Sequence, residues 1–250
     1  MEFKCGFVLF FGLMLISFET STSSAKLPSY FRICRHDPNI AGCIENFLIT
    51  LKPKLKEGIP ELHVPPMEPL DLGEINLQTT DNHGMLNFTN LKVWGCSDYT
   101  IKNVMVDLSR HIFKYNLKLP RLYFEGNYDM DMRLLAFELK DSGFMKGNLS
   151  NYRGNCLLHG KKINRNGNDY LTFNKIQISI ELGTSEVQLD SSLKRNLLIS
   201  KAIDELVVNN VDKVIEDMKP AIERALAEKF LRIANVISRN LPYNELFPSS

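Results

Sequence analysis

The stretch LPRLYFEGNYDMDMRL, from Leu119 to Leu134, decides the fold because its side chains alternate in character. Its apolar face consists of Leu122, Phe124, Gly126, Tyr128, Met130, Met132 and Leu134. Its polar face consists of Arg121, Tyr123, Glu125, Asn127, Asp129, Asp131 and Arg133. A period of two residues is typical of a half-buried β-strand, and this strand would exceed the usual length of about five or six residues. An apolar face that long needs an equally long partner.

A second long amphipathic segment runs from Leu193 to Asn240, where the period becomes helical. Its apolar stripe consists of Ile203, Val207, Val211, Val214, Met218, Ile222, Ala225, Ile233 and Ile237. A continuous helix of this length would measure about 70 Å at ~1.5 Å per residue. Pro220 lies inside it and predicts a kink or a break into two helices. A long one-sided sheet and a long one-sided helix in one chain favour a sheet rolled around the helix.

The region from about Leu70 to Leu189 is predicted to be strands and turns. Besides the opening stretch, the alternating segments are MLNFTNLKVWG, YTIKNVMVDL, HIFKYNLKL, LAFELKDSGFMKGNL and DYLTFNKIQISIEL. Phe113, Tyr115, Leu117 and Leu119 share a face until Pro120 switches it, as bends or bulges in a strongly curved antiparallel sheet require. DNHG and NRNGND are predicted hairpin turns.

A short amphipathic helix is predicted near the N-terminus, in CIENFLITLKPKLKEGI. Gly58 is placed as its C-terminal cap. The residues that fall on one helical face are Ile44, Phe47, Leu48, Leu51 and Leu55. The following PELHVPPMEPL is expected to be extended, because its prolines exclude a regular ladder.

The first 25 residues have the pattern of a cleaved secretory signal peptide. A charged start with Lys4 precedes the apolar run from Gly6 to Phe18, and Ser23 and Ala25 suit cleavage before Lys26. A transmembrane anchor is the alternative, but the run is shorter than the roughly 20 residues that a bilayer requires. The sequence therefore predicts a secreted single domain over 26–250, located in an extracellular fluid. Near-neutral charge gives no reason to expect nucleic acid.

Four cysteines remain after the leader, which in a secreted chain indicates disulfides. Three pairings are possible, and we favour Cys34 with Cys43 and Cys96 with Cys156. The sequons at Asn87 and Asn148 are candidate glycosylation sites. The scattered histidines and the lack of CxxC or HExxH argue against a metal.

The two ends of the chain resemble the insect takeout and juvenile-hormone-binding protein family. The N-terminal signature is FRICRHDPNIAGCIENFLITLKPKLKEGIPELHVPPMEPLDLGEI, and the closing motif is LPYNELFP. Between them the Leu-Pro strand keeps Gly126 and Tyr128, and Pro220 matches the proline of the family's long C-terminal helix. The resemblance implies an α+β TULIP-type fold, in which a strongly curved antiparallel sheet wraps the C-terminal helix around an elongated apolar tunnel. It also implies a monomeric, non-enzymatic carrier of juvenile hormone, another isoprenoid or a fatty-acid-like lipid.

A carrier needs apolar, adaptable side chains around its ligand and few polar groups. Each inward residue alone is more often ordinary core, but the resemblance favours the group as a lining. The candidate lining residues are Trp94, Phe113, Tyr115, Leu122, Phe124, Tyr128, Met130, Met132, Phe137, Phe173, Ile178, Val211, Ile215, Met218 and Ile222.

Few candidates for other chemistry are present. Tyr115 and Tyr128 offer hydroxyls to a ligand, although hydrogen bonds to backbone are the commoner use. Asp129 and Asp131 lie on the outward face, so catalysis or metal binding is not expected of them, and no cofactor is predicted. The competing hypotheses are a secreted structural or interaction protein with a filled tunnel and a membrane-surface lipid-transfer or antimicrobial module. No stable membrane insertion is expected.

Overall fold

The computed structural model describes residues 30–78, 84–134, 137–191, 201, 205, 208–239 and 241–249, without the side chains of 132–134, 137 and 139. Its helices are α1 (Ile40–Glu57), α3 (Val211–Ser238) and α4 (Tyr243–Leu246), with 3-10 turns η1 (Pro60–Leu62) and η2 (Cys96–Asp98). Its strands are β1 (Leu70–Gln78), β2 (Gly84–Trp94), β3 (Thr100–Asp107), β4 (Ile112–Leu134), β5 (Phe137–Arg165), β6 (Asn168–Glu181) and β7 (Thr184–Ser191). Within this described part, no helix combines the length and apolar character needed to span a bilayer.

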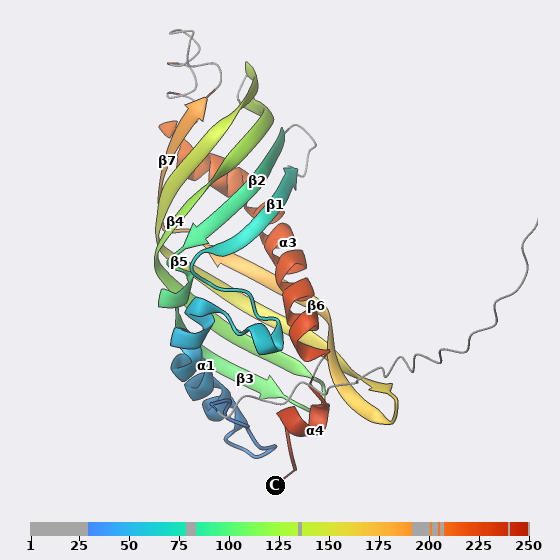
Figure 1. The fold of residues 1–250 in the computed structure, drawn as a ribbon. Coiled ribbons are helices and arrows are strands. Elements are labelled where there is room, and N and C mark those ends of the chain that lie inside the picture. The colour runs from blue at the N-terminus through green and yellow to red at the C-terminus, as the bar shows by residue number, and fades with distance from the viewer. Residues whose placement is uncertain are drawn as a thin grey trace, which may run out of the picture.

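Two very long strands form the spine of a seven-stranded antiparallel sheet. β4 has 23 residues and β5 has 29, and they pair along the whole of β4. On its other side β4 pairs first with β3 and then with β2, and β5 pairs with β7 and then with β6. The upper half of the sheet therefore contains β1, β2 and β7, and the lower half contains β3 and β6 (Figure 1).

The face of the sheet that is buried changes where the halves meet. Along β5, Met145 and Gly147 are buried before the junction and Tyr152 and Cys156 after it, so the buried parity changes from odd to even. Asn151 lies between them with a positive φ of 59°. Such a conformation reverses the alternation locally. Pro120 lies opposite Asn151, because Leu119 and Arg121 pair with the two neighbours of Asn151. The buried face of the sheet therefore changes at Pro120, which confirms the change of face expected there.

Local turn and cap signals also had the expected effect. The loop between β5 and β6 consists of Asn166 and Gly167, both with positive φ (51° and 84°), which is the preferred geometry of a two-residue hairpin loop. The NRNGND turn is therefore confirmed, whereas DNHG lies outside the described residues except for Gly84. Gly58 follows α1 with φ of 85°, as expected of a helix-ending glycine. The proline-rich connector differs from the extended prediction, because η1 makes a 3-10 turn in it.

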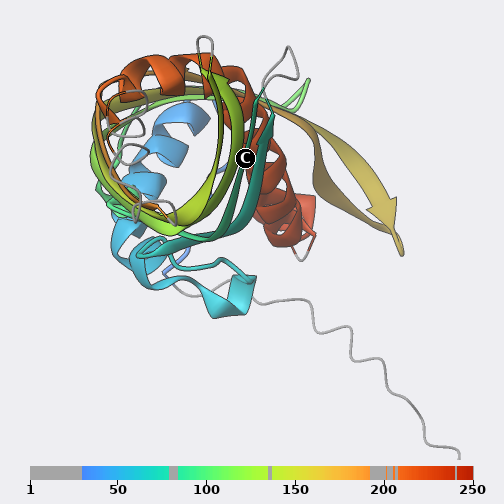
Figure 2. The same cartoon turned by 90° about the horizontal axis from the view of Figure 1, so that it is seen from above.

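Helix α3 lies along the open side of the curled sheet, between the edge strands β1 and β6 (Figures 1 and 2). It is continuous from Val211 to Ser238, so Pro220 does not break it into two helices. Of the predicted segment, the described residues before Val211 are only 201, 205 and 208–210. The architecture is α+β, with a curved antiparallel sheet closed by the long C-terminal helix.

Side chains of α3 hydrogen-bond the backbone of both sheet edges. On β6, the Asn235 side chain bonds both backbone groups of Phe173, and Glu223 accepts from the Ile180 N–H at 2.7 Å. On β1, Lys229 donates to the Leu72 carbonyl oxygen at 2.9 Å. Edge strands carry unpaired backbone groups that must find partners. The helix supplies those partners and so closes the sheet.

The lower end of the molecule is held by both termini of the described chain. Cys34 and Cys43 form the predicted disulfide at the start of α1. The N–H of His36 donates to the Pro248 carbonyl oxygen at 3.0 Å. Beside them Leu241, from the closing LPYNELFP motif, is only 1% exposed and packs with residues of α1 and η1. Burial of these apolar side chains against α1 fixes the lower end.

The predicted second disulfide is wrong, because Cys96 and Cys156 are both free and buried. The sheet register gives the reason. Cys156 pairs with Tyr115 of β4, whereas the strand preceding Cys96 ends by pairing Trp94 with Tyr123. These β4 partners are about 26 Å apart along the strand at ~3.3 Å per residue, whereas disulfide Cα atoms lie within about 7 Å.

Candidate functional site

The candidate site is the apolar cluster between the upper half of the sheet and α3, which we call the concave cluster. It brings together inward-facing residues of five strands, Cys96 of η2 and the first half of the helix. Its buried members are Leu70, Leu72, Ile75, Leu77, Leu86, Phe88, Leu91, Cys96, Tyr128, Met130, Met145, Val187, Leu189, Met218 and Ala221. Alternation along each strand aims one side chain in two toward α3. The cluster is therefore the surface that the opening sequence stretch covers.

Seven of the predicted lining residues lie in or against the concave cluster. They are Leu122, Phe124, Tyr128, Met130, Val211, Met218 and Ile222. Met218 is 1% exposed, Met130 is 2% exposed and Tyr128 is 3% exposed, so protein atoms surround all three. The inward direction that alternation predicts for the β4 residues among them is thus correct.

Other predicted lining residues belong to the lower half of the sheet. Phe113 packs against a second cluster that includes Cys34, Ile40 and Leu108, and its ring lies 5.8 Å from that of Phe173. Tyr115 of β4 and Ile178 of β6 pair with Cys156 of β5 from its two sides. Ile215 is half-buried on α3. The side chains of Met132 and Phe137 lie outside the described part of the chain.

The prediction that Trp94 joins the lining is wrong. Its neighbour Val93 packs against the concave cluster and pairs with Phe124. Because successive residues of a strand point to opposite faces, Trp94 points to the convex face. There its ring lies 5.4 Å from the ring of Tyr123, whose hydroxyl donates to Glu125.

A polar group lies within the concave cluster. The Tyr128 hydroxyl donates to Asp141 Oδ2 at 2.5 Å, and the Ser191 hydroxyl donates to Asp141 Oδ1 at 2.8 Å. Asp141 is 6% exposed and Ser191 is 7% exposed. We call these three residues the Asp141 group. Burial and the hydrogen bond to Asp141 raise the pKa of Tyr128, so its phenol keeps the proton that it donates.

Asp141 is not among the residues predicted from the sequence, although the sequence contains a signal for it. Asp141, Gly143, Met145 and Gly147 share one parity along β5, and this parity is inward. An acidic residue at an inward position of a strand is rare enough to indicate a function or a buried network. The Tyr128 hydroxyl was expected to bond to backbone, and it bonds to a carboxylate instead.

The two free thiols, Cys96 in the concave cluster and Cys156 in the lower half of the sheet, are poor nucleophiles. Burial raises the pKa of the Cys96 thiol to about 12, and the charge of Glu68 adds to the shift. Glu68 is held beside it by accepting hydrogen bonds from the N–H groups of Gly95 and Ser97, each at 2.8 Å. Burial also raises the pKa of Cys156, while a hydrogen bond to Tyr115 lowers it. A thiol with a raised pKa is a poor nucleophile.

The outward acidic residues behave as solvated surface groups. Asp129 is exposed, and Asp131 pairs with Lys140 at 2.9 Å. Of the two sequons, Asn148 is exposed and Asn87 is half-buried between β1 and β4. Asn148 is therefore the more accessible acceptor for a glycan.

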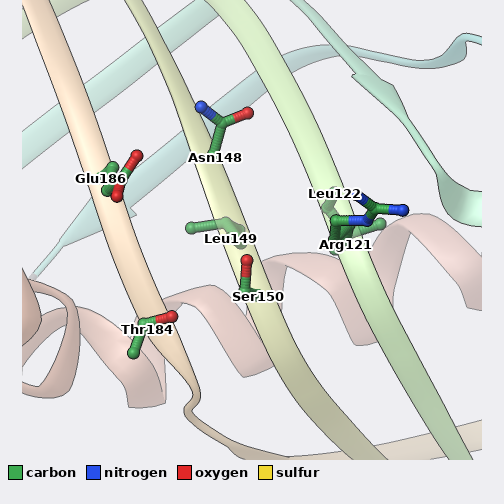
Figure 3. Close-up of a pocket in the computed structure, with 7 residues that line it drawn as sticks. All are labelled: Arg121, Leu122, Asn148, Leu149, Ser150, Thr184 and Glu186. Atoms are coloured by element: carbon green, nitrogen blue, oxygen red, sulfur yellow. The ribbon is translucent and has the colours of Figure 1, made fainter.

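The structure contains two surface depressions near elements that contribute to the concave cluster. One has a volume of about 190 Å³ and crosses β4, β5 and β7; its lining residues are Arg121, Leu122, Asn148, Leu149, Ser150, Thr184 and Glu186 (Figure 3). The other has a volume of about 410 Å³ and lies between β1 and α3; its lining residues are Glu74, Ile75, Asn76, Gln78, Ala221, Arg224, Ala225, Glu228 and Arg232. The second reaches two buried members of the concave cluster, Ile75 and Ala221.

Comparisons with known proteins agree with this architecture. The sequence profile of the family described as haemolymph juvenile hormone binding protein (JHBP) matches residues 11–248. The circadian clock-controlled protein daywake of Drosophila melanogaster is 23% identical over 237 residues, covering 90% of each chain. A putative beta-carotene-binding protein of Schistocerca gregaria is 22% identical over 213 residues, covering 84% of this chain and 85% of that one. The crystal structure of Takeout 1 from Epiphyas postvittana superposes with a TM-score of 0.71 at 20% identity, covering 86% of this chain and 99% of that one.

Proposed function

Because this chain belongs to the haemolymph juvenile hormone binding protein family, we propose that it is a secreted carrier that holds one elongated lipophilic molecule and performs no chemistry on it. The ligand lies between the concave face of the sheet and α3. The family and the fold expected from the sequence are thus confirmed. The ligand, the secretion and the monomeric state are parts of the proposal.

The observation that carries the proposal is the concave cluster itself. It gathers apolar side chains that lie far apart in the sequence, such as Leu70 on β1 and Met218 on α3. Met and aromatic side chains such as Met130, Met145 and Phe124 adapt to ligands of variable shape. A long, one-sided apolar surface closed by a helix is suited to an extended chain of carbon atoms.

The chemical class of the ligand is argued from the surface and from the relatives. One relative is described as a putative beta-carotene-binding protein, and the family description refers to juvenile hormone. Both names denote isoprenoids. We therefore place an isoprenoid or fatty chain on the concave cluster, with the larger part of its surface in contact with the apolar side chains of that cluster.

Secretion follows from the leader and the cysteines. We propose that residues 1–25 are removed and that 26–250 form one domain, carrying the disulfide between Cys34 and Cys43. A disulfide suits an oxidising extracellular compartment such as haemolymph. We also propose Asn148 as the sequon that carries a glycan, because its side chain is exposed on β5.

A second candidate is a secreted structural or interaction protein whose interior is filled by its own side chains. The near-complete burial of Tyr128, Met130 and Met218 favours it. The two candidates differ in whether the interior can admit a ligand. A carrier separates its walls when the ligand enters, whereas a filled interior admits nothing.

The test uses the protein secreted from cultured insect cells. Native mass spectrometry before and after organic extraction reports any bound molecule, and the extract identifies it. A carrier retains one lipid per chain, or takes up one equivalent of an added fatty probe after delipidation. An empty protein that takes up no probe would overturn the proposal.

A further inference from the structure

The smaller of the two depressions is built around the sequon at Asn148. Three of its seven lining residues are the sequon triplet 148–150, and the other four come from β4 and β7, the strands on either side of β5 (Figure 3). Gly147 is buried and Asn148 is exposed, so the Asn148 side chain points to the convex face, away from the concave cluster. The depression therefore lies outside the space that we assign to the lipophilic ligand.

The strand register explains why the surface is hollow beside Asn148. Two rows of paired residues cross the sheet here: Tyr123, Asn148 and Glu186 form one row, and Arg121, Ser150 and Thr184 form the next. Side chains that lie directly opposite one another stand about 4.5 to 5.5 Å apart at their Cβ atoms. The short side chain of Ser150 thus leaves an open space between its neighbours, and this space begins next to the Asn148 amide.

Tyr123 gives this space one apolar side. Its ring lies 5.4 Å from the ring of Trp94, and its hydroxyl donates to Glu125 Oε2 at 2.9 Å. These two contacts hold the ring in place on the convex face. A sugar ring has a face of C–H groups rimmed by hydroxyls, and such a face packs well against an aromatic ring with a polar edge. The ring beside Asn148 is therefore suited to the first sugar of a glycan.

The other sides of the space are polar and carry both signs of charge. Arg121, Thr184 and Glu186 are exposed. A guanidinium only donates hydrogen bonds, a carboxylate only accepts them, and a hydroxyl does both. Because the two charges are opposite, they favour a neutral molecule with many hydroxyl groups over an anion or a cation. The volume of about 190 Å³ is that of about six water molecules, which suits one sugar ring rather than an elongated lipid.

We propose that this depression is a saccharide site that seats the first N-acetylglucosamine of a glycan on Asn148. The inference rests on the secretion included in the proposed function, because the secretory pathway supplies the donor, an oligosaccharide linked to a lipid diphosphate. The bond from Asn148 Nδ2 to sugar C1 forms as the bond from C1 to the diphosphate oxygen breaks. The amide loses one proton, and the lipid diphosphate leaves with the electron pair. The first sugar then lies over Ser150 with its C–H face toward Tyr123. Its hydroxyl and acetamido groups bond to Arg121 and Glu186.

The first test observes the sugar on the unaltered sequence. The protein is secreted from insect cells in the presence of a mannosidase inhibitor, and endoglycosidase H then trims each glycan to a single N-acetylglucosamine. Peptide mapping reports whether Asn148 carries it. NMR should show nuclear Overhauser contacts between protons of this sugar and the ring of Tyr123. An unmodified Asn148, or a sugar on Asn148 without these contacts, would overturn the inference.

A double-mutant cycle measures what the seat contributes to stability. Stacking and hydrogen bonding of ordinary strength predict that the trimmed protein melts about 2 to 4 °C above Asn148→Gln, which carries no sugar at this position. In the Tyr123→Ala background this gain should fall to less than half, because the sugar loses its apolar contact. Phe144→Ala is the matched control and should leave the gain unaltered. Phe144 is 38% exposed on the same face of β5, and its backbone lies about 13 Å from that of Asn148 at ~3.3 Å per residue.

The outcomes separate this inference from the proposed function. A chain that the cells do not secrete contradicts both. A secreted chain that takes up lipid but has an unmodified Asn148, or the same gain in Tyr123→Ala, leaves the carrier in place and shows that the saccharide site is wrong. A glycosylated chain that takes up no lipid overturns the carrier alone. If Tyr123→Ala does not fold, the NMR contacts decide, because they are measured on the unaltered sequence.

Discussion

The side-chain amide of Asn235 on α3 donates to the Phe173 carbonyl oxygen at 2.8 Å and accepts from the Phe173 N–H at 2.9 Å. A helix side chain thus satisfies an edge strand in the way that a neighbouring strand would. The carboxylate of Glu223 acts similarly on Ile180, farther along β6. These contacts attach the helix to the lower half of the sheet in a fixed register.

Replacing Asn235 with Ala should destabilise the protein by about 1 to 3 kcal/mol, because both backbone groups of Phe173 lose their partner while they remain half-buried. Equilibrium denaturation with the disulfide intact measures the change. Asn174→Ala is the matched control, since Asn174 is exposed on the same strand. Equal effects of the two substitutions would show that the Asn235 contacts contribute nothing specific.

Met218→Ala should lower the free energy of unfolding by about 2 to 5 kcal/mol, since Met218 is a member of the concave cluster and is only 1% exposed. On the same helix Val236 is 40% exposed, and Val236→Ala should stay within about 0.5 kcal/mol of the unaltered protein. Denaturation of the delipidated protein measures both. A loss at Met218 as small as that at Val236 would place this helix face in a hollow rather than a packed core.

The sequence predicted features that depend on neighbouring residues and missed those that depend on distant ones. The inward direction of Tyr128 and Met130 follows from alternation, and the Asn166 to Gly167 turn follows from backbone preferences. The partners of Asp141 and Asn235 could not be predicted, because they are set by the register. Ser191 lies 50 residues from Asp141, and Phe173 lies 62 residues from Asn235.

The full length of β4 is a second feature that the sequence does not show. Alternation predicts one segment before Pro120 and another after it, whereas the structure joins them into the 23 residues of β4. A proline without an N–H interrupts the ladder at one position, and the pairing with β5 resumes on both sides without a change of register. The predicted disulfide between Cys96 and Cys156 is wrong for a similar reason. The number of residues between two cysteines does not show how far apart they lie along a sheet.

Mild acid should destabilise the protein through His111. Burial and the charge of Lys162 lower the pKa of His111 below its ordinary value of 6.5, although Asp107 acts in the opposite direction. The folded state therefore binds this proton less readily than the unfolded state. Its contribution to stability is complete above pH 6.5 and is lost as the pH falls through that value toward the folded pKa.

His111→Asn removes this group while retaining a residue that tolerates the positive φ of 53°. The unaltered protein should lose more stability than the variant as the pH falls below 6.5. Denaturation midpoints across that range measure the difference, and an NMR titration reports the pKa directly. A His111 pKa at or above 6.5 would contradict the expectation.

Alkylation should find Cys96 and Cys156 protected in the folded protein and free after unfolding without reductant. The raised pKa of Cys96 keeps it protonated near neutral pH, and burial blocks access to both thiols. Peptide mapping with iodoacetamide reports each position separately. Failure of both to react in the unfolded, unreduced chain would restore the disulfide that the structure excludes.

The central claim, that the concave cluster opens to hold one lipophilic molecule, is tested most directly by titrating the delipidated protein with N-phenylnaphthylamine. A carrier should show a saturable rise in fluorescence at one probe per chain, and dodecanol should reverse it. A linear response without saturation, or a rise that dodecanol leaves unaltered, would show that no such site exists and would contradict the account.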